Sequence, residues 1–467
     1  MELYGRRVIT TDATEITSEN IVAELNNAFN EHSLNRGEIE YLWNYYRGKQ
    51  PILQRSKTVR PEICNKIVEN RANEIVSFKV GYLCGEPIQY VGRNSEEDVS
   101  KGIAELNEMM FSEKKAAQDR RIVEWQNVCG TAYRLVLPDE MKDKDEAPFE
   151  INTLDPRDTF VVYSSEVGNK PMMAVKYRTD RENRRIASVY SSNWYWKLID
   201  DKIVESKAHS LGMIPIFEYP ANNARLGSFE IVLPLLDAIN TVASNRMDGI
   251  EQFVQAFIKF INCDISSDDF EKLKDMGAIK VKSTDGATAD VDIVTNELNQ
   301  VQTQTLVDYL YQTVLTICGM PNRNGGSSTS DTGSAVLLRD GWSLAEARAK
   351  DSELMFKESE QEVLKLILRI IRDTRGLSDA IYKLRLSDID SRFTRRNYDN
   401  IQSKSQVLVS MLQNNKIHPR LAFTSCGLFC DAENAYQMSM EYNEEQQQKA
   451  LELGANRETG EEVDKDV

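Results

Sequence analysis

Apolar residues recur at helical spacing in three long stretches of the second half of the chain. The first stretch predicts a helix over residues 229–262, and the other two predict helices over 300–318 and 343–373. Between the second and third helices lies a stretch rich in glycine and serine, which is typical of a loop. The expected order is therefore two helices, a loop and a third, longer helix.

The chain before residue 229 mixes helical and alternating patterns. Helices are predicted over 20–29 and 35–46, from Arg60 to Gly81, and over 100–128. The segments that follow alternate apolar and polar residues and are separated by turn residues, which predicts an antiparallel meander. These segments are TAYRLVLP, FEINTLD, TFVVYSS, MMAVKYRT, RIASVYSS and NWYWKLID.

The segment between the first two long helices has its own pattern. Residues 266–276 read as a short capped helix. AIKVKS and VDIVT flank an Asp-Gly turn and predict a β-hairpin. Residues 399–452 read as a helical cluster, whereas the last 25 residues hold eight acids against three bases and are expected to be disordered.

Charge limits the classes of partner. The 467 residues contain 73 Asp and Glu against 57 Lys and Arg, a net charge of −16, so the chain as a whole is not expected to grip nucleic acid. No apolar run reaches the roughly 18 residues that span a bilayer, so no membrane association is expected. The seven cysteines are odd in number and scattered, which argues against a disulfide framework and favours a cytoplasm-like compartment.

The Gly/Ser stretch is the best candidate for chemistry. A phosphate-binding loop of the Walker type ends in a lysine followed by serine or threonine and opens a helix after a buried strand. GGSSTSDTG has no lysine, follows a helix and contains Asp331, whose carboxylate would repel phosphate. A flexible loop is therefore favoured over a nucleotide site.

Metal and catalytic motifs are weak. Cys426 and Cys430 are close in sequence, but a zinc site needs about four ligands and only His418 lies within range. His32 and His209 are far from it in the sequence, and no nucleophile motif accompanies them. We expect no catalytic residue, no cofactor and no metal site.

Three stretches resemble the portal proteins of tailed bacteriophages, in the family of Gram-positive siphophage portals. They are "YLWNYYRGKQPIL", "NKIVENRANEIVSFKVGYLCGEPIQY" and "LGMIPIFEYPAN", and the likeness spans roughly residues 30 to 445. The matching residues are Tyr45, Tyr46, Gly48, Gln50, Asn65, Ile67, Val76, Tyr82, Leu83, Gly85 and Pro87.

The resemblance implies a mainly helical α+β portal fold that assembles into a ring of wing, stem, clip and crown regions. The implied regions are the wing at 1–228, the first stem helix at 229–262, the clip at 263–299, the second stem helix at 300–322, the tunnel loop at 323–340, a long helix into the wing at 341–375, a wing return strand at 376–398, a helical crown at 399–452 and an acidic tail at 453–467.

The resemblance also implies a function without catalysis. Family members form rings, commonly of twelve copies, at one capsid vertex of the virion after assembly in the host cytoplasm. Double-stranded DNA is packaged through the ring by terminase and is later ejected, without sequence-specific binding. Scaffold, major capsid protein and head-completion or adaptor proteins are the other implied partners.

Two sets of site residues follow. The stem-packing set is Leu235, Ile239, Val242, Ile250, Phe253, Phe257, Leu306, Leu310 and Val314. The tunnel-loop set is Arg323, Asn324, Gly325, Gly326, Ser327, Ser328, Thr329, Ser330, Asp331, Thr332 and Gly333. Family tunnel loops often include a basic residue, whereas here Arg323 and Arg339 only flank the loop.

Two alternatives stay open at this point. The chain could be a nucleotide-binding enzyme that uses the Gly/Ser loop, or a minor head protein that forms no channel. ATP turnover and native mass separate the first from a portal, and the absence of a ring in micrographs would favour the second.

Overall fold

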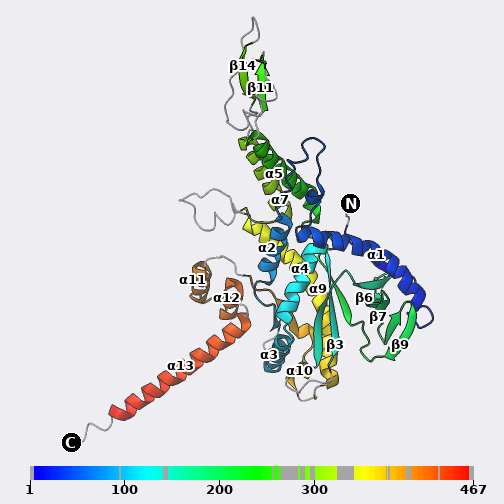
Figure 1. Cartoon of the computed structure of the whole chain (residues 1–467). Helices are drawn as coiled ribbons and strands as arrows, with labels where there is room; N and C mark the ends of the chain where they lie inside the picture. Colours follow the sequence, from blue (N-terminus) through cyan, green and yellow to red (C-terminus); the bar gives the residue numbers. More distant parts are fainter. Residues whose placement is uncertain are drawn as a thin grey trace. The chain divides into compact units, whose positions relative to one another are not determined.

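The computed structural model describes residues 5–93, 96–139, 146–254, 257–261, 263–264, 282–283, 290–294, 300–322, 341–374, 376, 379–395, 401–429 and 432–461. The described chain is mainly helical with a smaller share of strand, an α+β fold (Figure 1). Its contacts divide it into two compact units. Unit 1 comprises Met1–Trp43, Ile75–Glu230 and Arg323–Val467, and unit 2 comprises Asn44–Glu74 and Ile231–Asn322.

The larger sheet of unit 1 contains four of the six segments predicted to form one meander, whereas TAYRLVLP and FEINTLD lie in a separate sheet. Its strand order is β1-β5-β6-β7-β8-β9, antiparallel except for the parallel pair β1 and β5. The strands are β1 (Ile9–Thr11), β5 (Thr159–Ser164), β6 (Pro171–Thr179), β7 (Arg185–Tyr190), β8 (Trp194–Ile199) and β9 (Lys202–Ala208).

Helix α1 (Ile21–Tyr46) covers one face of this sheet with its N-terminal half. Alternate residues of the strands point to this face, so a strand contributes every second side chain to one core. The core cluster joins Ile21, Leu25, Ala28 and Phe29 of α1 to Phe160, Val162, Met173, Val175, Tyr177, Ala187, Val189, Trp196 and Leu198 of the sheet.

A three-stranded sheet of order β10-β3-β4 contacts the opposite face at the β5–β6 end. Its strands are β3 (Thr131–Pro138), β4 (Phe149–Leu154) and β10 (Ile216–Pro220). Tyr133 and Ile216 pack with Val161 and Ala174 in a second apolar cluster. On the face of β7, β8 and β9 that points away from α1, the side chains beyond the cluster are partly or fully exposed.

Four more helices and a small sheet complete the main part of unit 1. The predicted helix over 100–128 is two helices, because the chain turns at Lys114, whose φ is 55°. The elements are α2 (Arg71–Cys84), α3 (Glu97–Ser112), α4 (Lys115–Cys129) and α9 (Trp342–Thr374), with β2 (Gln89–Gly92) paired to β15 (Ile389–Arg392).

A buried charged cluster connects α9 to the three-stranded sheet β10-β3-β4 and to α4. Glu360 of α9 lies 2.8 Å from Nη1 of Arg134 on β3 and 3.1 Å from Nζ of Lys115 on α4. Asp119 pairs with the same two cations, and Tyr219 donates its hydroxyl to Glu360. Burial raises the pKa of Glu360, but the charges of Lys115 and Arg134 lower it by more, so that the net pKa is about 2. Glu360 is therefore ionised at neutral pH.

The described residues of unit 2 include the helices α5 (Leu233–Val254) and α7 (Gln300–Cys318) and short paired strands. Helix α7 has the predicted bounds, and α5 is the first long helix. Strand β11 (Phe257–Ile261) pairs antiparallel with β14 (Asp290–Val294), and β12 (Cys263–Asp264) pairs with β13 (Lys282–Ser283).

Three sequence predictions are corrected in unit 2 and at its junctions. The helix predicted to reach residue 262 ends at Val254, so Phe257 lies on strand β11 and not on a stem helix. The predicted hairpin around the Asp-Gly turn is not the observed pairing, because β14 pairs with β11 across a longer separation. The predicted helix from Arg60 begins only at Arg71, and residues 64–70 are extended without regular structure.

The C-terminal part is helical, as predicted, but extends further. Helices α11 (Ile401–Leu412), α12 (Pro419–Cys426) and α13 (Ala432–Glu461) follow β15 (Figure 1). α13 therefore runs through most of the last 25 residues, which were expected to be disordered. Within 376–398, where a return strand was predicted, the chain first forms two short helical turns, α10 (Ala380–Lys383) and η3 (Leu386–Asp388), and then the strand β15.

Candidate functional site

A row of polar side chains lies on the buried face of α5. Asn240, Ser244 and Asp248 are spaced by four residues, which places them on one side of a helix, and all three are buried. A buried polar side chain needs a hydrogen-bond partner, since leaving it unpaired costs about 1–3 kcal/mol. We call these three residues the polar ladder.

The ladder binds the backbone of an extended segment. Oδ1 of Asn240 accepts the N–H of Glu69 at 2.8 Å, Oγ of Ser244 accepts the N–H of Ile67 at 2.9 Å, and Oδ1 of Asp248 accepts the N–H of Asn65 at 2.6 Å. Every second N–H of residues 65–69 is thus bound, as it would be by a neighbouring β-strand. We call residues 65–69 the docked segment.

Asp248 also holds two cations. Its Oδ2 lies 3.0 Å from Nη2 of Arg55 and contacts Nζ of Lys57, and its Oδ1 accepts Nδ2 of Asn65. Burial raises the pKa of Asp248, but the hydrogen bonds from Lys57 and Asn65 and the charge of Arg55 lower it below the usual value. Asp248 is therefore ionised at neutral pH and holds both ends of residues 55–65 against α5.

Gln50 links Asn240, the first residue of the ladder, to the C-terminal end of α1. Its Oε1 accepts Nδ2 of Asn240 at 2.5 Å, and its Nε2 donates to the carbonyl of Tyr45 and to Oδ1 of Asn70. The turn that brings Gln50 back passes through Gly48, whose φ of 92° favours glycine. A side chain at this turn would be strained, which accounts for the glycine.

Several of the residues that carry the family resemblance make this docking. Tyr45 donates its hydroxyl to Asp237 of α5 at 2.8 Å, and Gln50 and Asn65 bind ladder residues. Ile67 contributes its backbone N–H. The polar motif positions of this region thus act together to hold residues 44–70 on α5.

The predicted stem-packing residues divide into three groups. Ile239 and Val314 are buried within unit 2, and Leu235, Val242 and Leu310 are half-buried. Ile250 and Leu306 are exposed. The side chains of Phe253 and Phe257 lie outside the described residues.

The exposed face of α7 is nearly free of charge. Thr305, Thr313 and Thr316 donate their hydroxyls to carbonyls four residues earlier in the same helix, at 2.8–3.0 Å. Since the hydroxyls are already bound, this face offers few free hydrogen-bond donors. Val301 and Tyr309 extend it with apolar surface, 76% and 66% exposed, and Asp308 is the one charged residue of the helix.

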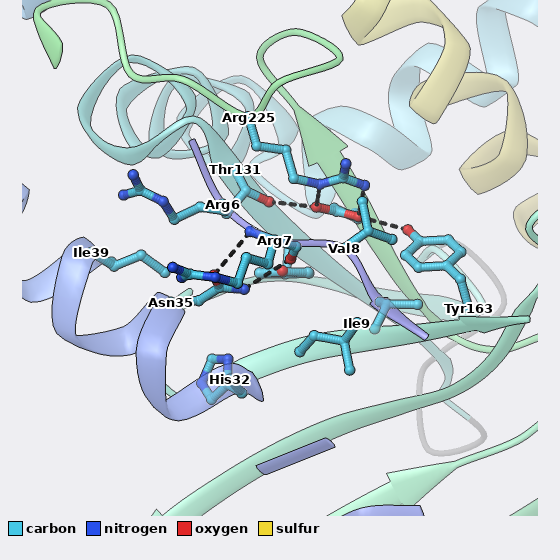
Figure 2. Close-up of a pocket in the computed structure, with 13 residues that line it drawn as sticks. Arg6, Arg7, Val8, Ile9, His32, Asn35, Ile39, Thr131, Tyr163 and Arg225 are labelled. Carbon is cyan, nitrogen blue, oxygen red and sulfur yellow. Dashed lines mark hydrogen bonds and ion pairs between the residues drawn. The ribbon is translucent and has the colours of Figure 1, made fainter. Parts of the chain in front are cut away.

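A second polar junction lies in unit 1 and is shown in Figure 2. Residues 6–9 run between α1 and β3, and Asn35 of α1 binds both the N–H and the carbonyl of Arg7 at 2.9 Å. Beside them, Glu218 accepts from Thr131, Tyr163 and Arg225. The enclosed cavity is about 10 Å³, room for about one water molecule, so the junction is structural and not a ligand site.

The other candidates for chemistry gain no support. The Gly/Ser loop, residues 323–340 including the whole tunnel-loop set, lies outside the described residues. His418 caps α12 by accepting the N–H of Arg420, and the Cys426 thiol bonds to the carbonyl of Phe423. Within the ranges that the structure describes, no group of three or more His, Cys, Asp or Glu side chains could hold a metal ion.

The ladder was missed in the sequence, although it left a signal there. Asn240, Ser244 and Asp248 recur every four residues along α5, so they share one side of a helix that also carries apolar residues at helical spacing. A polar stripe on the apolar side of a helix indicates that something polar docks there. What docks could not be read, because the docked segment is some 180 residues away in sequence.

A known protein family matches most of the chain. The model of the family described as phage portal protein, SPP1 Gp6-like, matches residues 25–450. The chain belongs to this family. No curated protein matches the chain.

Membership fixes the broad character of the molecule. Portal proteins are structural components of the phage capsid and not enzymes, and the family implies a homo-oligomeric ring. Among the helices that the structure describes, none is both long and apolar enough to pass through a membrane.

Proposed function

We propose that copies of this chain form the portal ring at one capsid vertex, through which terminase packages double-stranded DNA and to which head-completion proteins attach. In this proposal α5 and α7 are the stem, residues 263–299 are the clip and residues 323–340 are the tunnel loop. The family match over most of the chain is the observation that supports it.

The surface of unit 2 supports a stem made of several copies. Met247 and Ile250 of α5 and Leu306 of α7 are large apolar residues that stay exposed in one copy. Exposed apolar residues that cluster on two neighbouring helices are typical of an interface. In a ring, a neighbouring copy would cover part of this surface on each side.

The uncharged face of α7 supports a channel wall. Moving DNA is retarded by each cation that pairs with a phosphate, because every such pair adds affinity. Thr305, Gln312 and Thr316 lie on the exposed side of α7, and no lysine or arginine occurs between residues 300 and 318. We assign this face to the channel.

The channel assignment is tested by adding charge to that face. Thr305→Lys with Thr316→Lys should leave ring assembly unchanged and lower the amount of packaged DNA by about tenfold or more, because each copy would then hold phosphates. Packaging is measured as nuclease-protected DNA per particle.

The matched control is Thr305→Val with Thr316→Val, which changes the same positions without charge. It should package as the wild type does. If the lysine variant forms rings and packages DNA normally, α7 does not line the channel.

The alternative of a nucleotide-binding enzyme has no observation in its favour. The Gly/Ser stretch lacks the lysine of a Walker loop, and the family is structural. A minor head protein without a channel would instead be revealed by native mass.

A further inference from the structure

Sheet register gathers cations that are scattered in the sequence. Lys176 pairs across the sheet with Ser188, which pairs with Lys197, which pairs with Glu205. Residues directly opposite in a sheet share one face. In the neighbouring rows, Tyr190 pairs with Tyr195 and then Lys207, and Arg178 pairs with Ile186, then Ile199 and Lys202. We call this surface of β6–β9 the basic sheet face.

The basic sheet face is the side that α1 does not cover. The alternate residues of the same strands, such as Val175, Val189 and Trp196, form the buried core under α1. On the basic sheet face, the three-stranded sheet β10-β3-β4 packs near Tyr190, which is partly buried against it. Lys197 is half-buried, and Arg178, Lys202 and Lys207 are exposed.

The charge of this face opposes that of the chain. Residues 171–209 carry eight Lys and Arg against five Asp and Glu, in a chain whose net charge is −16. The acids in the turns are paired with turn arginines, Asp180 with Arg184 and Asp201 with Arg185. The face itself holds five cations and one carboxylate, that of Glu205.

Among the described residues, three of the five cations form no ion pair. Lys207 lies 2.6 Å from Glu205, and Lys176 contacts Asp158 at the edge of the face. Arg178, Lys197 and Lys202 form no ion pair with any described residue. Ser188 and Tyr195 add hydroxyl groups between the cations, with their oxygens 3.4 Å apart.

We propose that the basic sheet face binds the phosphate backbone of duplex DNA on the outside of the ring. Lysine, arginine, serine and tyrosine are the side chains that contact phosphate oxygens without reading sequence. At physiological ionic strength charges interact over about 8 Å, so the acidic remainder of the chain does not cancel a local basic face. The site is separate from the channel, and placing it outside a ring rests on the proposed function.

A protein partner is the less favoured occupant. Protein interfaces concentrate their energy in well-packed apolar or aromatic anchors, and lysine is depleted in them. Here lysines dominate, and Tyr190 and Tyr195 pack on each other with ring centroids 4.9 Å apart. Sequence-independent contact with phosphates fits this composition better.

The test uses a closed circular duplex, which cannot be threaded through an intact ring. Arg178→Glu with Lys202→Glu should weaken binding of the circle by about tenfold and lower the slope of log affinity against log salt by about two. Lys101→Glu with Lys350→Glu is the control, since both lysines are exposed and the change in net charge is the same. The control should bind as the wild type does.

Three results would overturn the proposal. The wild type could fail to bind the circle, the control could lose as much affinity as the face variant, or the face variant could bind normally and fail to enter capsids. The last result would assign the face to a protein partner. Imaging the same preparations separates this proposal from the ring: intact rings that do not bind the circle refute only the basic sheet face.

Discussion

At the scale of single residues, the buried groups explain the dependence of stability on conditions. His32 of α1 is buried, stacks on Phe160 with ring centroids 4.5 Å apart, and its Nε2 lies 3.2 Å from the carbonyl oxygen of Arg157. Burial lowers the pKa of His32 from 6.5 to about 4, and the nearby charge of Arg36 acts in the same direction. The folded chain therefore holds this histidine neutral.

The lowered pKa of His32 predicts a loss of stability in mild acid. Between pH 6.5 and about 4 the unfolded chain takes up a proton that the folded chain does not, so the free energy of unfolding falls as pH falls. At pH 4.5 the contribution of His32 should be about 2–3 kcal/mol smaller than at pH 7.

His32→Gln removes the titrating imidazole and keeps a side-chain amide that can donate a hydrogen bond to the carbonyl oxygen of Arg157. Urea unfolding at pH 7 and pH 4.5 measures the difference between variant and wild type at each pH. An equal difference at both values would contradict a neutral buried His32.

At the scale of elements, the ladder determines which face of α5 is covered. Because residues 65–69 occupy the side of Asn240, Ser244 and Asp248, the side with Met247 and Ile250 is left for other contacts. The docked segment thus covers one side of α5 within its own copy.

The ladder makes a measurable contribution to stability. Ser244→Ala leaves the N–H of Ile67 without its acceptor and should lower the free energy of unfolding by about 1–2 kcal/mol. Thr241→Ala is the control, because Thr241 is exposed on the same helix and bonds only to its own helix, so its effect should stay within about 0.5 kcal/mol. Urea unfolding of the two variants checks this, and equal effects would show that the ladder does not hold the docked segment.

The same elements show what sequence patterns can and cannot reveal. The spacing of apolar residues predicted α7 at its observed bounds, because a helix is a local structure. Ile63 and Ile67 have helical spacing too, yet the segment is extended because distant side chains of α5 bind its N–H groups. The hairpin prediction was wrong for the same reason: it rested on a local Asp-Gly turn, whereas β14 pairs with the distant strand β11.

The candidate sites follow this division. Ile239 and Val314 were identified as packing residues from periodicity and are buried. The ladder was present as a four-residue repeat whose partner could not be read. The basic sheet face could not be found at all, because only strand register places Arg178 and Lys202 in one row on the same face of the sheet.

At the scale of the whole molecule, the proposed function depends on assembly. One copy exposes large apolar residues on α5 and α7 and an uncharged face on α7, and the family implies a ring. We propose twelve copies around a channel, with the acidic chain avoiding the phosphate contacts that would stall DNA.

Native mass spectrometry of the purified chain, with electron micrographs of the same sample, tests that claim most directly. The account predicts a single closed assembly with a mass of about twelve chains and a central hole wide enough for a DNA duplex. A particle with the mass of one chain and no central hole, under all salt conditions, would contradict it.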